Sequence, residues 1–376
     1  MENDILQAKL QVIEAGKMLL ETGLIARTWG NVSCRISEDE FVITPSGRSY
    51  EDLTPDEIVA VKIEDLSYEG DIKPSSEKGV HAAAYKLRPE VNFVIHTHQT
   101  NASIVSAMGN EIPVDSEIHA GIIGKTIPVA KYGLPGTKKL RKNVYESIEN
   151  NPGSRAIIME HHGAVCMGTG LNDAFNIASI LEDACGVYIA KKESKSKDIK
   201  KPVCYTSVRN GEGFIISGDD GSSFEAMLDS PLDRAQFATA SMHRDIFVAH
   251  PEINVILQSA TPEILQAAAK CGGKLRPLLD DYAQIAGRNV KKFKGNKALG
   301  ALKGRSAAII KNGGILCLGT DMFEAKAVQM VVEKNCKTFL AGKNFKELHY
   351  INAFESALMR MVYVMKYSKQ KDKKEA

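Results

Sequence analysis

The chain has 376 residues, of which 44% are hydrophobic and 25% are charged, and this composition excludes a disordered, collagen-like or mucin-like protein. Its 48 basic and 46 acidic residues give a formal net charge of +2, and the basic excess lies locally in residues 191–201 and 366–376, so a nucleic-acid partner is not indicated. The length favours two domains over one hydrophobic core.

The cysteines and the N-terminus bear on the cellular compartment. Seven cysteines are an odd number, and none stands in a C-x-x-C pair, so we expect reduced thiols. Residues 1–24 mix charged and apolar residues at helical spacing, unlike a secretory signal. No stretch reaches the roughly 18 apolar residues that a membrane span needs. The sequence therefore predicts a soluble, cytoplasmic protein with no membrane partner.

The first predicted elements are a helix over 5–23 and a strand over 41–43. Polar turns that contain glycine flank this strand, and they read Gly30-Asn31-Val32-Ser33 and Thr44-Pro45-Ser46-Gly47. As ordinary turns these segments need no function.

A second predicted helix, over 77–88, follows Pro74-Ser75-Ser76-Glu77. We expect the serines at the N-cap and Glu77 in the first turn, where amides and hydroxyls can hold an anion such as phosphate. A plain capping motif is the structural alternative. A carboxylate beside a metal-bound carbonyl substrate could instead act as a general base.

A strand predicted at 93–95 runs into His96-Thr97-His98. Alternation along the strand puts both imidazoles on one face about 7 Å apart, a span that a metal can bridge. Such a pair is by itself more often structural than metal-binding.

A third ligand is expected after the strand predicted at 156–159, where the chain reads His161-His162-Gly163. The glycine would allow a sharp turn, and spacing alone leaves open which of the two histidines binds. Three imidazoles around Zn²⁺ leave an open coordination position, as in catalytic sites.

A helix over 171–191 and a lysine-rich connector lead to a second half that repeats the first. Pro89-Glu90-Val91-Asn92-Phe93-Val94-Ile95 returns as Pro251-Glu252-Ile253-Asn254-Val255-Ile256-Leu257, and residues 163–169 return as 314–320. Strands at 214–216, 255–257 and 307–310 and helices at 231–249 and 322–340 complete a pattern of sheets covered by helices. We predict two homologous domains, 1–195 and 202–376.

The repeat tests the metal hypothesis within one molecule. In the second half, His96, His98 and His162 become Gln258, Ala260 and Gly313. Ser76 and Glu77 become Ala238 and Thr239. Structural histidines would have no reason to disappear together, so the second domain is predicted to be a degenerate copy that lacks metal ligands.

These motifs together resemble the class II aldolase and adducin head-domain family over nearly all of residues 5–190. The resemblance implies an α/β fold class: two tandem α/β/α sandwiches, each with a largely antiparallel central sheet. It implies one Zn²⁺ or other divalent ion per chain, in the first domain, held by His96, His98 and His162, with Glu77 as the adjacent acid/base. Substrate and phosphate contacts would come from Gly30, Asn31, Thr44, Ser46, Gly47, Ser75 and Ser76.

The implied activity is that of a metal-dependent lyase, an aldolase that makes or breaks a C–C bond of a small hydroxy-ketone or sugar phosphate through a metal-stabilised enediolate. Glu117 stands where an aldolase relative carries a catalytic tyrosine, so it is a second catalytic candidate. The alternatives are an epimerase, dehydratase or decarboxylase with the same enolate chemistry, or a non-catalytic adducin-like interaction module.

Family members that resemble this chain commonly form cyclic tetramers with active sites near subunit borders. A homo-oligomer is therefore expected, namely a dimer of chains that imitates a tetramer of domains. In that arrangement the second domain replaces a neighbouring subunit and would present a side chain such as Asp281 or Tyr282 across the border.

Overall fold

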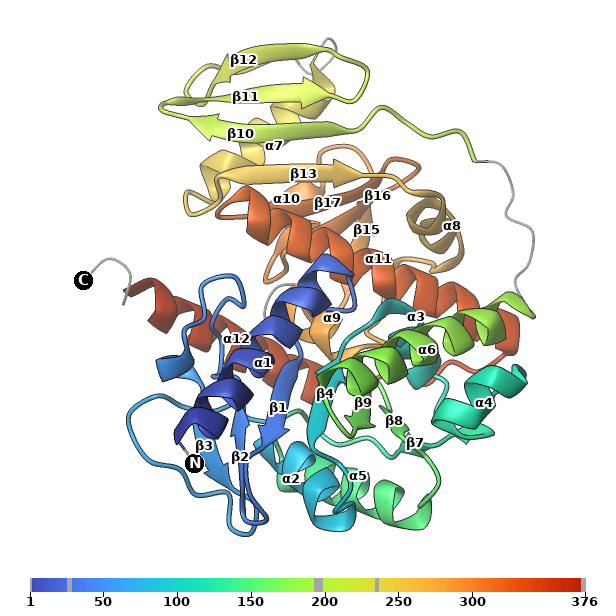
Figure 1. Cartoon of the computed structure of the whole chain (residues 1–376). Helices are drawn as coiled ribbons and strands as arrows, with labels where there is room; N and C mark the ends of the chain where they lie inside the picture. The colour runs from blue at the N-terminus through green and yellow to red at the C-terminus, as the bar shows by residue number, and fades with distance from the viewer. Residues whose placement is uncertain (1, 26–28, 193–198, 234–236, 373–376) are drawn as a thin grey trace. The chain divides into compact units, whose positions relative to one another are not determined.

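The computed structural model describes residues 2–25, 29–192, 199–233 and 237–372. The chain divides into two compact units, 1–193 and 194–376, and each contains its own sheet (Figure 1). Residues 193–198 of the predicted connector and residues 373–376 of the basic tail lie outside the described residues.

The first unit is built on a seven-stranded sheet with the order β3-β2-β1-β4-β9-β8-β7. All pairings in this sheet are antiparallel except that of β7 with β8, so the sheet is mixed. The strands are β1 (Asn31–Arg35), β2 (Glu40–Ile43), β3 (Val59–Lys62), β4 (Phe93–Thr97), β7 (Val129–Ala130), β8 (Ala156–Met159) and β9 (Gly163–Gly168), while β5 (Ile112–Pro113) and β6 (Thr126–Ile127) form a separate ribbon.

Helices cover both faces of this sheet (Figure 1). Phe93 and Ile95 of β4 belong to the core shared with α1 (Glu2–Glu21) and α6 (Leu171–Ala190). Val94, between them, faces the core shared with α2 (Lys78–Leu87) and α5 (Lys138–Asn150). This alternation is the period of two of a strand buried on both faces, and it makes a three-layer sandwich. Three short helices, η1 (Pro55–Glu57), α3 (Thr100–Ser106) and α4 (Glu117–Ile123), complete the unit.

The second unit repeats this strand order. Its sheet runs β12-β11-β10-β13-β17-β16-β15-β14, and only β15 and β16 pair in parallel among the described residues. The strands are β10 (Tyr205–Asn210), β11 (Gly213–Gly218), β12 (Ser223–Met227), β13 (Val255–Ser259), β14 (Lys274–Leu275), β15 (Val290–Phe293), β16 (Ala307–Ile310) and β17 (Gly314–Gly319). Two tandem α/β/α sandwiches with largely antiparallel sheets, the predicted fold class, are thereby confirmed.

The helices of the second unit are α7 (Ala238–Ala249), α8 (Pro262–Lys270), α9 (Asp280–Ile285), α10 (Ala298–Leu302), α11 (Met322–Phe345) and α12 (Ala353–Asp372). Within the described ranges no counterpart of α1 covers the outer face of β10 and β11. Val208 and Ile215, which pair directly on that face, are 42% and 41% exposed. Their positions in the first unit, Cys34 and Val42, are buried in the core with α1.

Two predicted helix lengths were wrong. α7 begins at Ala238 instead of residue 231: residues 231–233 and 237 are not helical, and residues 234–236 of the predicted helix lie outside the described residues. α11 runs to Phe345, beyond the predicted residue 340, and ends where Lys346 adopts a left-handed φ of 61°. None of the helices in the described part of the chain has the length and apolar character needed to cross a bilayer.

Candidate metal centre

The sheet topology brings the three predicted histidines together. His96 lies near the end of the central strand β4, and period-two alternation from Val94 turns its side chain toward the face covered by α2. His162 precedes β9, and the pairing of Thr97 with Ala164 holds it beside His96. The three ring centroids lie 4.7 to 4.9 Å from one another.

The donor geometry of His96, His98 and His162 fits a metal ion. The Nε2 atom of His96 lies 3.0 Å from that of His98 and 3.2 Å from that of His162. Two nitrogens bound to one tetrahedral zinc at about 2.0–2.1 Å are separated by roughly 3.3 Å. His96 Nδ1 lies 2.9 Å from the carbonyl oxygen of Ala164, a contact that leaves the Nε2 lone pair for the centre. These residues could therefore hold a divalent ion.

Glu77 supplies a carboxylate beside the three-histidine cluster. Its Oε1 lies 3.0 Å from His162 Nε2, its Oε2 lies 3.1 Å from His96 Nε2, and the side chain is 8% exposed. Burial alone would raise the pKa of Glu77, but the neighbouring His162 and His96 hold that pKa well below its usual value. Glu77 is therefore ionised and can act as a fourth donor or as a base.

The prediction that Glu77 lies in the first turn of a helix was wrong by one residue. α2 begins at Lys78, and Glu77 is its N-cap residue, but the carboxylate makes no capping hydrogen bond. It turns to the histidines instead, while Ser75 Oγ accepts the Glu77 amide proton at 3.2 Å. The plain capping alternative therefore does not describe this carboxylate.

The loop between β8 and β9 settles which of the two adjacent histidines lies in the cluster. His162 does, whereas His161 adopts a left-handed φ of 62° and lies 3.8 Å from a Glu160 oxygen. Asn312, at the position of His161 in the second unit, has the same φ of 62°. The sharp turn is thus made at His161 and not, as predicted, by Gly163.

Position 163 requires a glycine because it has no room for a side chain. A Cβ atom there would collide with the backbone carbonyl oxygen of Thr97, the neighbour of His96 in β4.

We expect Gly163→Ala to separate β4 from β9 at this point, to lower the free energy of unfolding by about 1–3 kcal/mol and to weaken metal binding. Denaturant unfolding with and without added zinc measures both effects. A matched control is Gly153→Ala, because no atom lies within 4 Å of a Cβ built on Gly153. Equal stability of the two variants would contradict the steric argument.

Two predicted polar turns form the rim of the centre. The Ser75 amide donates to the Thr44 carbonyl oxygen at 3.0 Å, and a β-bridge joins Pro45 to Pro74, so the turns lie side by side. Thr44 and Ser75 are buried. The exposed members of this rim are Ser46, Gly47 and Ser76.

Asn31, the first residue of β1, and Gly30, which precedes it, lie beside the centre. Gly30 has a φ of 108°, and a Cβ there would lie 2.6 Å from the His96 carbonyl oxygen. Asn31 pairs with His96 across the sheet, and its Nδ2 donates to Glu77 Oε2 at 3.3 Å. Asn31 is thus placed against the Glu77 carboxylate.

Sequence reasoning missed His81. This residue of α2 is fully buried and hydrogen-bonds Asn31 Oδ1 through Nε2 and Ser33 Oγ through Nδ1, the latter at 2.6 Å. Burial, with some repulsion from His96, lowers the pKa of His81 to about 3 although Glu77 raises it, so the ring is neutral. A signal was present, because the alignment that maps His96 onto Gln258 maps His81 onto His243, and both are histidine.

Glu117 lies in the exposed first turn of α4, after the N-cap residue Ser116. In the described part of the chain no hydrogen bond or ion pair joins Glu117 to the histidine cluster. Its predicted catalytic role stays a prediction.

Asp281 and Tyr282 are buried within the second unit, so the expectation that either presents its side chain outward was wrong. Tyr282 is fully buried, and its hydroxyl donates to the Leu275 carbonyl oxygen at 2.9 Å. Asp281 is 2% exposed and forms an ion pair with Lys334 at 2.5 Å. Both side chains thus bond within their own unit.

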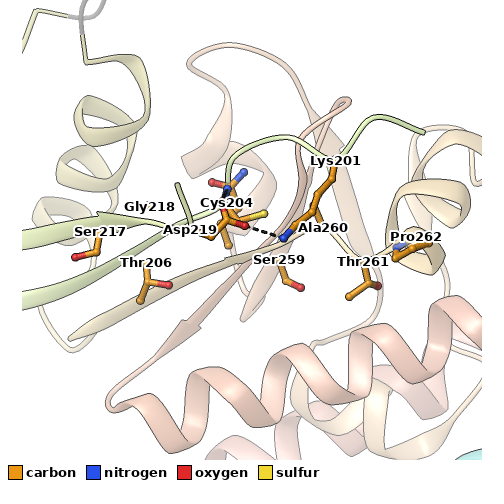
Figure 2. Close-up of a pocket in the computed structure, with 11 residues that line it drawn as sticks. Lys201, Cys204, Thr206, Ser217, Gly218, Asp219, Ser259, Ala260, Thr261 and Pro262 are labelled. Atoms are coloured by element: carbon orange, nitrogen blue, oxygen red, sulfur yellow. Dashed lines mark hydrogen bonds and ion pairs between the residues drawn. The ribbon is translucent and has the colours of Figure 1, made fainter. Parts of the chain in front are cut away.

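In the second unit a glutamine occupies the position of His96. Gln258 Oε1 accepts from the Tyr205 amide at 3.3 Å, and Nε2 donates to the Gly313 carbonyl oxygen at 2.9 Å, so the amide joins two strand ends with ordinary hydrogen bonds. Beside it lies a cavity of about 530 Å³, lined in part by Thr206 and Ser217 and by Lys201 and Asp219, which form an ion pair (Figure 2). Among the described residues the three-histidine cluster of the first unit is the one group with metal-ligand spacing.

Comparisons with known proteins agree with the organisation of the chain as two related units. The family model described as Class II Aldolase and Adducin N-terminal domain matches residues 10–189 and again 203–340, so the predicted tandem duplication is confirmed. A 5-deoxy-D-ribulose 1-phosphate aldolase of Bacillus thuringiensis serovar kurstaki is 30% identical over 183 residues, which are 48% of this chain and 84% of that protein. The L-fuculose phosphate aldolase of Escherichia coli K12 is 34% identical over 179 residues, 48% of this chain and 81% of that protein.

A solved structure of L-fuculose 1-phosphate aldolase is also similar. It shows 32% sequence identity and a TM-score of 0.47, and the match covers 50% of this chain and 86% of that one.

Proposed function

The chain belongs to the class II aldolase and adducin N-terminal domain family, and on that premise we propose that its first unit is a metal-dependent aldolase that acts on a ketose 1-phosphate. The observation that carries the proposal is the convergence of three imidazole Nε2 atoms and the Glu77 carboxylate on one buried point. The names of the aligned aldolases, which act on phosphorylated deoxy-sugars, support the substrate class.

The metal site would be formed by His96, His98 and His162, with Zn²⁺ as the preferred ion because all three ligands are imidazoles. When bound, the ion supplies Lewis-acid polarisation of the substrate carbonyl. Glu77 then moves a proton at the carbon next to that carbonyl: it removes the proton when the C–C bond forms and returns it after cleavage. Its position beside two of the proposed ligands supports this role.

The polar rim would hold the substrate phosphate. Ser75 and Ser76 stand before a helix whose first amides and positive dipole end favour an anion. Thr44, Ser46 and Gly47 come from the adjoining turn, and Asn31 and Gly30 come from the start of β1 and the residue before it. These residues connect phosphate binding with the orientation of the substrate toward Glu77.

The test is a panel of ketose 1-phosphates, with 5-deoxyribulose 1-phosphate and fuculose 1-phosphate first. We expect cleavage to dihydroxyacetone phosphate and an aldehyde, loss of turnover on chelation, and recovery with about one equivalent of zinc per chain. Product identification separates the aldolase from an epimerase, dehydratase or decarboxylase. A protein that contains stoichiometric metal and yet cleaves none of these substrates would contradict the proposal.

The second unit is proposed to be catalytically silent, since hydrogen-bonding or apolar residues replace its metal ligands. A dimer of chains would then carry four family domains and two metal ions. Sedimentation mass and metal content per chain test both statements together, and a monomer or two ions per chain would contradict them.

A further inference from the structure

We propose that His81 is a positioning residue, which as its Nε2–H tautomer fixes the Asn31 amide so that Asn31 holds the Glu77 carboxylate against the histidine cluster. The catalytic consequence of this arrangement rests on the function proposed above. The tautomer itself does not, and it can be measured independently.

The contacts form one continuous chain of buried side chains. Glu77 Oε2 accepts from Asn31 Nδ2 at 3.3 Å, and Asn31 Oδ1 contacts His81 Nε2. On the far side of the ring, His81 Nδ1 lies 2.6 Å from Ser33 Oγ, which lies 2.7 Å from the Tyr85 hydroxyl. All five side chains belong to residues that are at most 8% exposed.

The spacing of this chain follows from the geometry of the two elements that carry it. Glu77, His81 and Tyr85 are four residues apart along α2, a rise of about 6 Å per step. Asn31 and Ser33 are two residues apart along β1, a rise of about 6.6 Å. Because the two steps nearly match, helix and strand side chains alternate along one line.

Hydrogen-bond direction follows from the orientation of the Asn31 amide. Its Nδ2 faces Glu77 Oε2 and its Oδ1 faces His81 Nε2, and an amide oxygen can only accept. The neutral His81 ring therefore carries its proton on Nε2, and Nδ1 accepts from the Ser33 hydroxyl. Ser33 in turn accepts from the Tyr85 hydroxyl. With the opposite tautomer, His81 Nε2 and Asn31 Oδ1 would face each other as two acceptors, and the buried Asn31 oxygen would lose its hydrogen-bond donor.

The second unit provides a comparison within the same molecule. Ser207 Oγ lies 2.7 Å from His243 Nδ1, which reproduces the contact of Ser33 with His81. The positions of Asn31 and Glu77 are Tyr205 and Thr239, and the buried His243 Nε2 has no hydrogen-bond partner among the described residues. The serine–histidine half of the chain thus belongs to the fold. The half that leads to Asn31 occurs only where the acid/base is present.

Two substitutions of His81 separate its two nitrogens, because a glutamine amide can place its NH₂ near the Nε2 position, whereas an asparagine side chain reaches only the Nδ1 position. We expect His81→Asn to lower kcat by about 10- to 100-fold, with KM and bound metal little changed, and His81→Gln to recover most of the rate. His243→Asn is the matched control for a loss of stability at an equally buried ring and should leave kcat unchanged. Equal impairment of the two His81 variants, or loss of metal that accounts for the loss of rate, would overturn the proposal.

The decisive measurement uses the metal-free full-length protein with ¹⁵N-labelled histidine. Imidazole ¹⁵N shifts, assigned by the loss of one signal pair in His81→Gln, are expected to show a protonated Nε2 and an unprotonated Nδ1 between pH 6 and pH 8. An Nδ1–H tautomer or a doubly protonated ring would overturn the proposal. A wild-type protein that cleaves no ketose phosphate would count against the proposed function alone, since the tautomer would still be decided by the shifts.

Discussion

Replacing His96 with alanine is expected to reduce the metal content from about one ion per chain to less than about a tenth of that value. His96 is the central member of the cluster, because its Nε2 lies within 3.2 Å of the donors of His98, His162 and Glu77. Two remaining imidazoles do not complete the set of at least three protein ligands that zinc sites use. Elemental analysis of the purified protein, after dialysis against zinc-free buffer, is the measurement.

The matched control for His96→Ala is Gln258→Ala, at the same position of the second unit. That variant removes two partly buried hydrogen bonds but no metal donor, so its metal content should equal that of the unaltered protein. Circular dichroism on both variants shows whether each remains folded. Full metal occupancy in His96→Ala would contradict the ligand assignment.

Replacing Glu77 with glutamine is expected to lower kcat by about 100-fold or more. The substitution keeps the size of the side chain and its contact with Asn31, but it removes the negative charge and the proton acceptor. Metal content must be measured on the same sample, because a carboxylate whose two oxygens each lie within 3.1 Å of one ligand nitrogen also stabilises a bound cation. The slow variant should still bind most of its metal, which separates loss of the base from loss of the ion.

Glu117→Gln extends this test to the other predicted carboxylate. Glu117 is exposed on α4, so in a single chain its replacement should affect kcat far less than the replacement of Glu77. A large loss of rate in Glu117→Gln would support its predicted catalytic role, whereas normal turnover in Glu77→Gln would contradict the assignment of Glu77 as the base.

The sequence by itself determined the family, the duplication and two of the clustered histidines, His96 and His98, and it limited the third to His161 or His162. Period-two alternation at His96 and His98 is a local property of a strand, and the repeat shows which polar residues are dispensable for the framework. Both signals lie in short stretches of chain, so no tertiary information was needed to read them. The family resemblance, together with the replacement of Glu77 by Thr239 in the second half, predicted Glu77 near the centre.

Only the tertiary structure decided which atoms meet. Whether His161 or His162 faces the cluster depends on a left-handed φ at His161 and on the close approach of Gly163 to Thr97, which are backbone properties of a loop between paired strands. The repeat marks His81, which returns as His243, but its hydrogen-bond partners come from the packing of α2 against β1, where residues 50 positions apart in sequence share a hydrogen bond. Asp281 and Tyr282 gave no sequence signal of their burial, since a charged or polar side chain is buried only where a partner such as Lys334 lies opposite it in space.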